Sequence, residues 1–259
     1  MTLLSYCLRP DWPAPAHVHA LVTTRQGGSS EAPFNSLNLG DHVGDDPECV
    51  AANRQALARA LNELAPAQAP QWLKQVHGVR VITPAANAEL RAQQILEADA
   101  ATTTDTAVPL TVMTADCLSV FFTDQQGTRI AVAHAGWRGL CDGVLEKTVA
   151  EFPHAEQVIA WLGPAIGPLA FEVGDEVRCA FMAQDQQAEQ AFSAVPEKPG
   201  HWLADLYVLA RQRLARVGVT QVSGGTHRTW TESASFFSYR REGRTGRMAS
   251  VIWLSPRLA

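Results

Sequence analysis

Three apolar segments between residues 108 and 134 constrain the fold more than any other part of this chain. They are VPLTVM, LSVFFTD and TRIAVAH, separated only by short turns. Each is apolar along most of its length instead of alternating with polar residues. This pattern is typical of strands that are covered on both faces. We therefore expect a central β region with further layers on both sides.

Further elements lie on either side of this β region. HVHALVTT, QWLKQVHGVRVIT and QVIAWLGPAIGP are expected to contain strands. The segment 45–64 is expected to be a helix, because Asp46 suits the N-cap and Pro47 suits the first helical position. Helices are also expected at 135–152, 174–184 and 205–219, the last ended by Gly218. The C-terminal segment SFFSYRREGRTGRMASVIWL predicts two strands joined by a loop.

The order of these elements predicts the fold class. The strands cluster in the sequence and do not alternate strictly with helices. The pattern favours an α+β fold with a large mixed β-sheet flanked by helices. No stretch separates two domains convincingly, so we expect a single domain over residues 1–259.

Composition excludes several classes of protein. The 259 residues carry a formal net charge of -5, which does not favour nucleic acid as a partner. No apolar run approaches the roughly 20 residues that span a bilayer, so no membrane role is expected. The start of the chain lacks a signal peptide pattern. The 5 cysteines are scattered without a CxxC pair. We expect a cytoplasmic protein, as a monomer or homodimer.

Three residues stand where a strand gives way to a turn or loop: His77 in KQVHG, Cys117 in TADCLSV and His134 in AVAHAGWRG. A thiolate and two imidazoles suit Zn²⁺ and leave a fourth position for water or substrate. Such a site lowers the pKa of bound water to about 7. The spacing of the three residues is not a metal signature. Hydrogen-bonded histidines and a buried, core-filling cysteine are the alternative interpretation.

Polar residues in nearby turns are candidates for binding an anionic substrate. HAGWRG leads from His134 into a helix whose N–H groups, with Arg138, suit an anion; a tight turn is the alternative. Arg25 and Asn38 lie in two turn-rich loops. From the C-terminal loop, we expect one arginine to enter a site, with Arg240 as the candidate. The four arginines of that loop are Arg240, Arg241, Arg244 and Arg247.

The chain resembles the YfiH-like family, also described as laccase-domain or polyphenol oxidase proteins and as purine nucleoside phosphorylases. The resemblance covers nearly the whole chain. It rests on ordered segments: TTRQGG, SLNLGDHVGDD, WLKQVHG, TADCLSV, AVAHAGWRG, LGPAIGPLAFEVGDEV and FFSYRREGRTGRMASVIWL. It implies a zinc site of His77, Cys117 and His134 and the YfiH-like α+β fold with a large mixed sheet.

The resemblance also implies an activity. Family members are credited with phosphorolysis of adenosine, inosine and S-methyl-5′-thioadenosine, and with adenosine deamination. Nucleosides and phosphate are then the small-molecule partners. Arg25, Arg138 and Arg240 are the expected anion or substrate contacts, with Asn38 beside them. Asp116 is expected either to act as a base or ligand-orienting group, or to have a role in the turn.

Two other functions stay open. Cysteine with two histidines resembles part of a blue-copper set, so copper and a polyphenol oxidase activity are one alternative; no methionine is obviously placed as axial ligand. The other is a cysteine hydrolase with Cys117 as nucleophile and His134 as base. An amidase that edits peptidoglycan precursors is consistent with a cysteine hydrolase, and such a role is linked to similar bacterial proteins.

Overall fold

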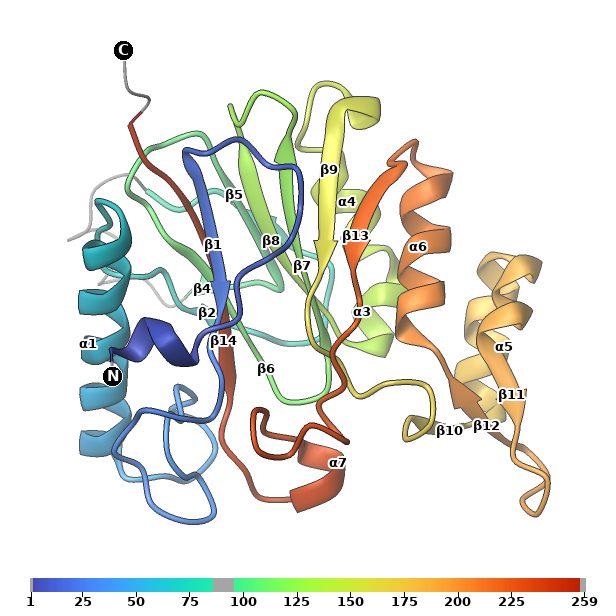
Figure 1. Ribbon diagram of the computed structural model, residues 1–259. Coiled ribbons are helices and arrows are strands. Elements are labelled where there is room, and N and C mark those ends of the chain that lie inside the picture. The colour runs from blue at the N-terminus through green and yellow to red at the C-terminus, as the bar shows by residue number, and fades with distance from the viewer. Residues whose placement is uncertain (1, 86–95, 257–259) are drawn as a thin grey trace.

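The three apolar segments form buried strands of two stacked sheets (Figure 1). They are β6 (Leu110–Thr114), β7 (Leu118–Asp124) and β8 (Ile130–Ala135), and every residue in them is buried. The structure is a computed structural model that describes residues 2–85 and 96–256. The expectation of strands covered on both faces is therefore confirmed.

The larger sheet has six strands in the order β13-β9-β7-β8-β5-β3. Two of its pairings, β13 with β9 and β3 with β5, are parallel, and the other three are antiparallel. The predicted large mixed sheet is thus confirmed. The strands not yet introduced are β13 (Gln221–Gly224), β9 (Val158–Leu162), β5 (Ala100–Thr103) and β3 (Val81–Ile82).

A second, antiparallel sheet has the order β1-β14-β6 and packs against the first. Its outer strands are β1 (Val18–Val22) and β6, on either side of β14 (Met248–Leu254). Val112 and Ile252 from this sheet share a buried cluster with Phe121 and Val132 from the six-stranded sheet. β6 and β7 follow each other in the chain but lie in different sheets.

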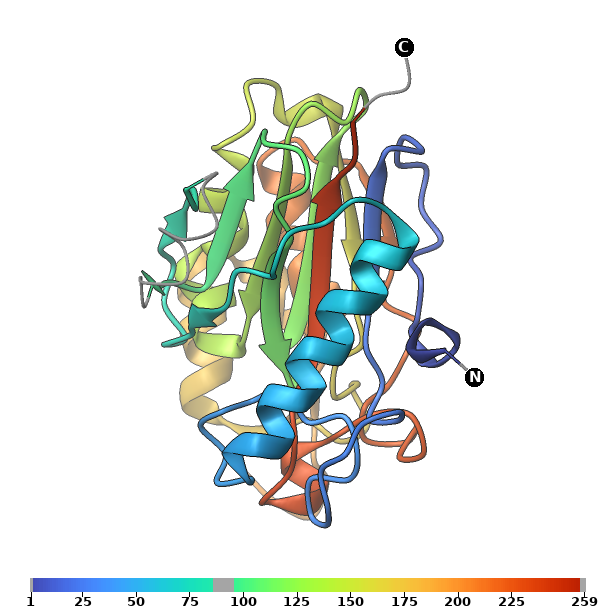
Figure 2. The same ribbon diagram turned by 90° about the vertical axis from the view of Figure 1, so that its left-hand side faces the viewer.

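Helices cover the two outer faces of this pair of sheets (Figure 2). On one side, Leu57 and Leu61 of α1 (Pro47–Leu64) pack against Val251 and Trp253 of β14. Asp46 caps α1 as expected, since its side chain accepts a hydrogen bond from the N–H of Glu48. On the other side, α4 (Val144–Val149) and α6 (Leu206–Arg216) pack against the six-stranded sheet.

The remaining elements are short and lie at the ends and sides of the two sheets. They are α3 (Trp137–Asp142), α5 (Asp175–Gln184), α7 (Tyr239–Glu242), the pair β2 (Leu73–Lys74) and β4 (Leu96–Glu97), the sheet of β10 (Glu172–Gly174), β12 (His201–Ala204) and β11 (Phe192–Ala194), and the 3₁₀ helices η1 (Leu3–Tyr6), η2 (Ala155–Gln157) and η3 (Gln186–Ala191). Within the described residues, no helix is long and apolar enough to cross a membrane.

Two sequence predictions were wrong in detail. The helix expected at 135–152 is two helices, α3 and α4, because Gly143 has a φ of 97°, which breaks the α-helical path. The first of the two strands expected in the C-terminal segment does not form: residues 235–238 have no regular structure, and the loop after them begins with the short helix α7. It forms because the Ser238 side chain accepts a hydrogen bond from the N–H of Arg241 and so caps a helical turn.

The connection from β6 to β7 determines where Cys117 lies. The chain leaves the three-stranded sheet at Thr114 and enters the six-stranded sheet at Leu118. It turns at Asp116, which has a φ of 100° although it is not glycine. The connection from β6 to β7, which contains Cys117, lies at the lower end of the sheets in the view of Figure 1.

Candidate metal centre and pocket

Three side chains from separate segments converge at the end of the sheets. His77 follows β2, Cys117 precedes β7, and His134 lies near the end of β8. One ligand atom from each lies within 4.8 Å of the others. The distance from Sγ of Cys117 to Nε2 of His77 is 3.8 Å, and the two imidazole rings meet edge to face. The structure thus brings together the three metal ligands expected from the sequence.

A buried carboxylate that sequence reasoning missed, Asp99, holds this cluster. It accepts hydrogen bonds from Nδ1 of His134 at 2.8 Å and from the N–H of His77 at 2.9 Å. It also accepts from the N–H groups of Val76 and Gly78 at 3.1 and 2.7 Å. Its position, directly before a buried strand in the segment LEADAA, is a weak signal that points to no particular partner.

The loop from β8 to α3 leaves room for His77 because residue 136 is glycine. A β-carbon placed on Gly136 would lie 2.7 Å from Cδ2 of His77 and 3.2 Å from Sγ of Cys117. At Gly139, a β-carbon would lie 2.7 Å from the carbonyl oxygen of Gly78. The glycines of HAGWRG therefore let the turn around His77 pack directly against the start of α3.

The charged forms of Cys117, His134 and Asp99 stabilise one another. Burial alone would raise the pKa of the Cys117 thiol, but the nearby His134 and His77 rings lower it below its ordinary value. Burial opposes the charged form of His134, whereas Cys117 and Asp99 raise the pKa of its imidazole. Burial would also raise the pKa of Asp99, but hydrogen bonds from His134 and the adjacent turn lower it. The site therefore favours a thiolate at Cys117.

The cluster fits a zinc ion. The ligand atoms of a tetrahedral zinc site with one sulfur and two nitrogens lie about 3.5 Å apart, given the usual bond lengths. Sγ of Cys117 and Nε2 of His77 are 3.8 Å apart, close to that spacing, and all three ligand atoms lie within 4.8 Å of one another. Because Asp99 engages Nδ1 of His134, the other ring nitrogen is left for a metal. Three protein ligands leave a fourth position open to the adjoining cavity.

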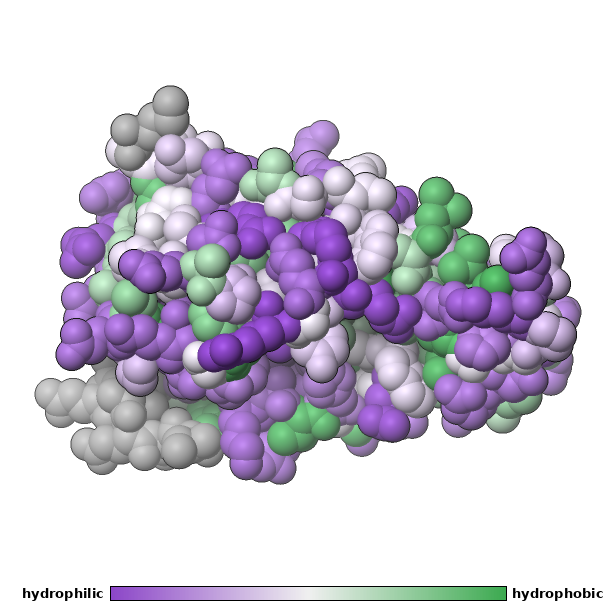
Figure 3. All heavy atoms as spheres, turned by 90° about the horizontal axis from the view of Figure 1, so that it is seen from below, coloured by the Kyte–Doolittle hydropathy of each residue, from purple (hydrophilic) through white to green (hydrophobic). Residues whose placement is uncertain are grey.

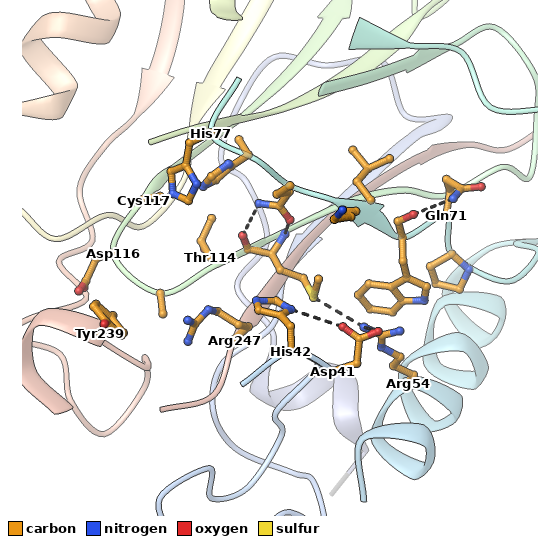
Figure 4. Close-up of a pocket in the computed structure, with 18 of the residues that line it drawn as sticks. Asp41, His42, Arg54, Gln71, His77, Thr114, Asp116, Cys117, Tyr239 and Arg247 are labelled. Atoms are coloured by element: carbon orange, nitrogen blue, oxygen red, sulfur yellow. Dashed lines mark hydrogen bonds and ion pairs between the residues drawn. The ribbon is translucent and has the colours of Figure 1, made fainter. Parts of the chain in front are cut away.

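The cluster lies in the wall of a cavity of about 1150 Å³. Figure 4 places His77 and Cys117 toward one end and Asp41 and Arg54 toward the other, with Arg247 between them. The remaining walls are mostly apolar or neutral and come from β2, β6, α7 and nearby loops, including the connection from β9 to β10. They include Trp72, Leu73, Gln75, Met113, Thr114, Ile166, Phe171 and Tyr239. Figure 3 shows that the outer face at the α7 end of the molecule is mainly hydrophilic.

Two arginines of the C-terminal loop line this cavity, not one as expected. Arg240 is exposed at the rim and donates from Nη1 to the carbonyl oxygens of Glu172 and Ala170. Arg247 is half-buried. Burial lowers the pKa of its guanidinium, while Cys117, Tyr239 and Asp116 act in the opposite direction. Arg247, which was not the arginine chosen from the sequence, is therefore the deeper cation and lies close to the metal ligands.

Asp116 lines the cavity but is bound to its neighbours. Its Oδ1 accepts a hydrogen bond from the Thr229 hydroxyl at 2.5 Å, and its Oδ2 accepts one from the N–H of Arg240 at 2.7 Å. Its carbonyl oxygen accepts from the N–H of Ile166. Asp116 therefore connects the crossing before β7 to the start of α7.

The other three candidates for anion binding do not line the cavity. Arg25 forms an ion pair with Glu242 at 2.6 Å and lines a separate, shallow pocket. Asn38 is fully buried, and its Oδ1 accepts from the N–H of Arg247, so it supports the loop that carries that residue. Arg138 is exposed, and its guanidinium packs over the ring of Trp137.

The sequence matches a family model over residues 19–255, and the model is described as multi-copper polyphenol oxidoreductase laccase. A purine nucleoside phosphorylase of Pseudomonas aeruginosa is 53% identical over 249 residues, which cover 95% of this chain and 98% of that protein. The purine nucleoside phosphorylase YfiH of Escherichia coli is 52% identical over 252 residues, which cover 97% of this chain and 100% of that protein.

Solved structures show the same fold. A crystal structure of a Neisseria meningitidis protein superposes with a TM-score of 0.90 at 47% identity, and the match covers 97% of this chain and 100% of that one. The Bacillus licheniformis hypothetical protein YfiH superposes with a TM-score of 0.83 at 33% identity, covering 92% and 93% of the two chains. The mixed α/β architecture described above is therefore shared with these proteins.

Proposed function

The chain belongs to the family described as multi-copper polyphenol oxidoreductase laccase, and we propose that it is a zinc-dependent purine nucleoside phosphorylase. In this reaction a phosphate oxygen forms a bond to C1′ of the ribose while the bond from C1′ to the purine nitrogen breaks. The purine takes up a proton and leaves as the free base, and ribose 1-phosphate is the other product. The names of the two relatives reported above support this activity.

One observation carries the proposal: the metal cluster and Arg247 line the same cavity. Nη1 of Arg247 donates to the carbonyl oxygens of Thr245 and Gly246, which fixes the guanidinium. Its Nε and Nη2 groups have no hydrogen-bond partner among the described residues. A fixed, half-buried guanidinium with free N–H groups suits a phosphate. Phosphate bound there would lie near a nucleoside held at the metal end.

Each part of the cavity has a distinct task in this proposal. His77, Cys117 and His134 hold the zinc, which when bound supplies a Lewis acid facing the cavity. Arg247 binds and orients the phosphate. Apolar walls, such as Phe171 and Met113, cover the purine and exclude water from the reacting carbon. Excluding water favours phosphate over hydrolysis as the fate of the ribose.

We propose adenosine, inosine and S-methyl-5′-thioadenosine as the substrates. A cavity of about 1150 Å³ has room for a purine nucleoside and phosphate together. Its apolar walls suit a methylthio group as well as the hydroxyl it replaces. We further propose adenosine deamination, in which water adds to C6 of the purine and ammonia leaves to give inosine. Both reactions then use one nucleoside site.

A specific observation favours a cysteine hydrolase as the second candidate. Asp99 binds His134 at 2.8 Å, and His134 adjoins Cys117, which is the order of a catalytic triad. A triad leaves His77 unexplained, although its Nε2 lies 3.8 Å from the same sulfur. A metal explains all three side chains. A multicopper oxidase is less well supported, because the described residues hold one such cluster.

The test combines metal content with product analysis. Protein purified without added metal is expected to hold close to one zinc per chain and to convert inosine and phosphate into hypoxanthine and ribose 1-phosphate. Cys117→Ala should lose the zinc and at least a thousandfold in rate. Cys179→Ala, which changes an exposed cysteine on α5, is the matched control and should keep both. Full activity in Cys117→Ala, or copper in place of zinc, would overturn the proposal.

A further inference from the structure

One fully buried carboxylate, Asp99, reaches both histidines of the metal cluster. Its Oδ1 accepts from two donors: Nδ1 of His134 at 2.8 Å and the N–H of His77 at 2.9 Å. Its Oδ2 accepts from the N–H groups of Val76 and Gly78 at 3.1 and 2.7 Å. The four donors come from two segments that are far apart in the chain. Asp99 therefore joins the turn that carries His77 to the strand that carries His134.

The turn at His77 is shaped around this carboxylate. His77 has a φ of 60°, which is uncommon for a residue other than glycine. In this conformation the N–H groups of Val76, His77 and Gly78 all point at the carboxylate of Asp99. Three convergent N–H groups make a concave site that favours a negative charge. Without the carboxylate, these three donors would lose their common partner, and nothing else shown here would hold the turn in this conformation.

The same carboxylate decides which nitrogen of His134 is available. An ionised carboxylate only accepts hydrogen bonds, so the proton of neutral His134 lies on Nδ1. The lone pair is then on Nε2. The N–H of His134 also donates to the carbonyl oxygen of Asp99 at 2.7 Å, so backbone and ring are fixed by one residue. A carboxylate in this position orients a ligating histidine and makes it a stronger donor.

We propose that Asp99 is the positioning residue of the metal centre. Asp99 fixes His77 through the backbone N–H of that histidine and fixes His134 through its imidazole ring. This inference rests on the zinc site of the proposed function and not on the reaction. Asp99 contacts neither the metal nor the substrate in this assignment. It acts by holding two of the three ligands in the geometry that zinc requires.

Asp99→Asn tests the proposal, with zinc affinity as the readout. The amide keeps the shape but replaces one acceptor by a donor, so it cannot serve all four N–H groups. We expect zinc, measured by competition with a chromophoric chelator, to bind 10- to 100-fold more weakly. Asp124→Asn is the matched control, since Asp124 is also buried and accepts from the N–H groups of Gln126 and Thr128 in a turn away from the cluster. It should keep the wild-type affinity.

A measurement on the unchanged protein covers the case in which Asp99→Asn does not fold. In zinc-loaded wild-type protein labelled with ¹⁵N-histidine, His134 should show a proton on Nδ1 and a metal-bound Nε2. A proton on Nε2 would overturn the proposal, as would unchanged zinc affinity in folded Asp99→Asn or equal weakening in Asp124→Asn. None of these measurements uses nucleoside or phosphate. A protein that binds zinc as expected but leaves nucleosides intact would therefore count only against the proposed function.

Discussion

Gly136 lies directly against the ring of His77, although the two residues are 59 positions apart: a β-carbon on Gly136 would come 2.7 Å from Cδ2 of the imidazole. Gly136 has a φ of -60°, which any residue adopts, so glycine is needed here for space and not for backbone conformation. The small residue lets a ligand from the β2 side of the cavity reach the ligands from β7 and β8.

Gly136→Ala is therefore expected to push the His77 ring away from Cys117 and weaken zinc binding by at least tenfold. The fold should persist, because an imidazole can rotate away from a methyl group. Zinc affinity by chelator competition checks this prediction. Gly174→Ala is the control: the nearest atoms to a β-carbon there belong to the flexible end of the exposed Glu176 side chain, and zinc affinity should not change. Unchanged zinc affinity in Gly136→Ala would contradict the tight packing described here.

Asp116→Asn separates a positioning role from a catalytic one. Asp116 already accepts from the Thr229 hydroxyl and the N–H of Arg240, so we expect it to fix α7 over the cavity. The loss of one charge-assisted hydrogen bond, about 1.5–3 kcal/mol, corresponds to roughly 10- to 100-fold in kcat/KM. The zinc content should stay at the wild-type level.

The pH profile of Asp116→Asn gives the decisive readout. A positioning residue leaves the shape of the kcat/KM profile unchanged. If the variant instead lost one limb of the profile together with more than a thousandfold in kcat, Asp116 would be the general base and the positioning role would be wrong.

The sequence predicted the metal ligands better than the residues that support them. His77, Cys117 and His134 each stand near a strand end, which made them candidates, and the resemblance to the YfiH-like family implied that they act as one set. The structure brings the three side chains together. Asp99 gave no comparable signal, because its role depends on a turn at residues 76–78 and a ring 35 positions away. A single sequence does not show which distant segments are in contact.

The sequence also did not predict which sheet each strand joins or where the loop side chains point. The apolar pattern predicted β6 and β7 as strands but not that they belong to different sheets, since the turn at Asp116 decides this. The C-terminal loop begins with an unexpected helical turn, α7, and has Arg240 at the rim of the cavity and Arg247 deeper inside. Arg138 suited an anion at a helix start, yet α3 has only 6 residues and this arginine is exposed.

Arg247→Gln tests the phosphate site. We expect the KM for phosphate to rise 10- to 100-fold, because a charge-assisted hydrogen bond contributes about 1.5–3 kcal/mol, while zinc content stays unchanged. Arg244→Gln is the matched control from the same loop. Its guanidinium donates to the carbonyl oxygen of Gly44 and packs over Phe34, and Arg244 does not line the cavity. Equal effects of the two substitutions on the KM would show that Arg247 has no special part in binding phosphate.

Removal of the metal should lower stability as well as activity, because the three ligands belong to segments that zinc would join. His77 follows β2, Cys117 precedes β7, and His134 lies in β8. A ligand that binds only the folded state at a thousand times its Kd adds about 4 kcal/mol to the free energy of unfolding. Chelation should therefore lower the midpoint of thermal unfolding by several degrees, and added zinc should restore it. In Cys117→Ala, chelator should not shift the midpoint. If the midpoint of thermal unfolding of the wild-type protein changed with neither chelator nor zinc, this cluster would hold no metal.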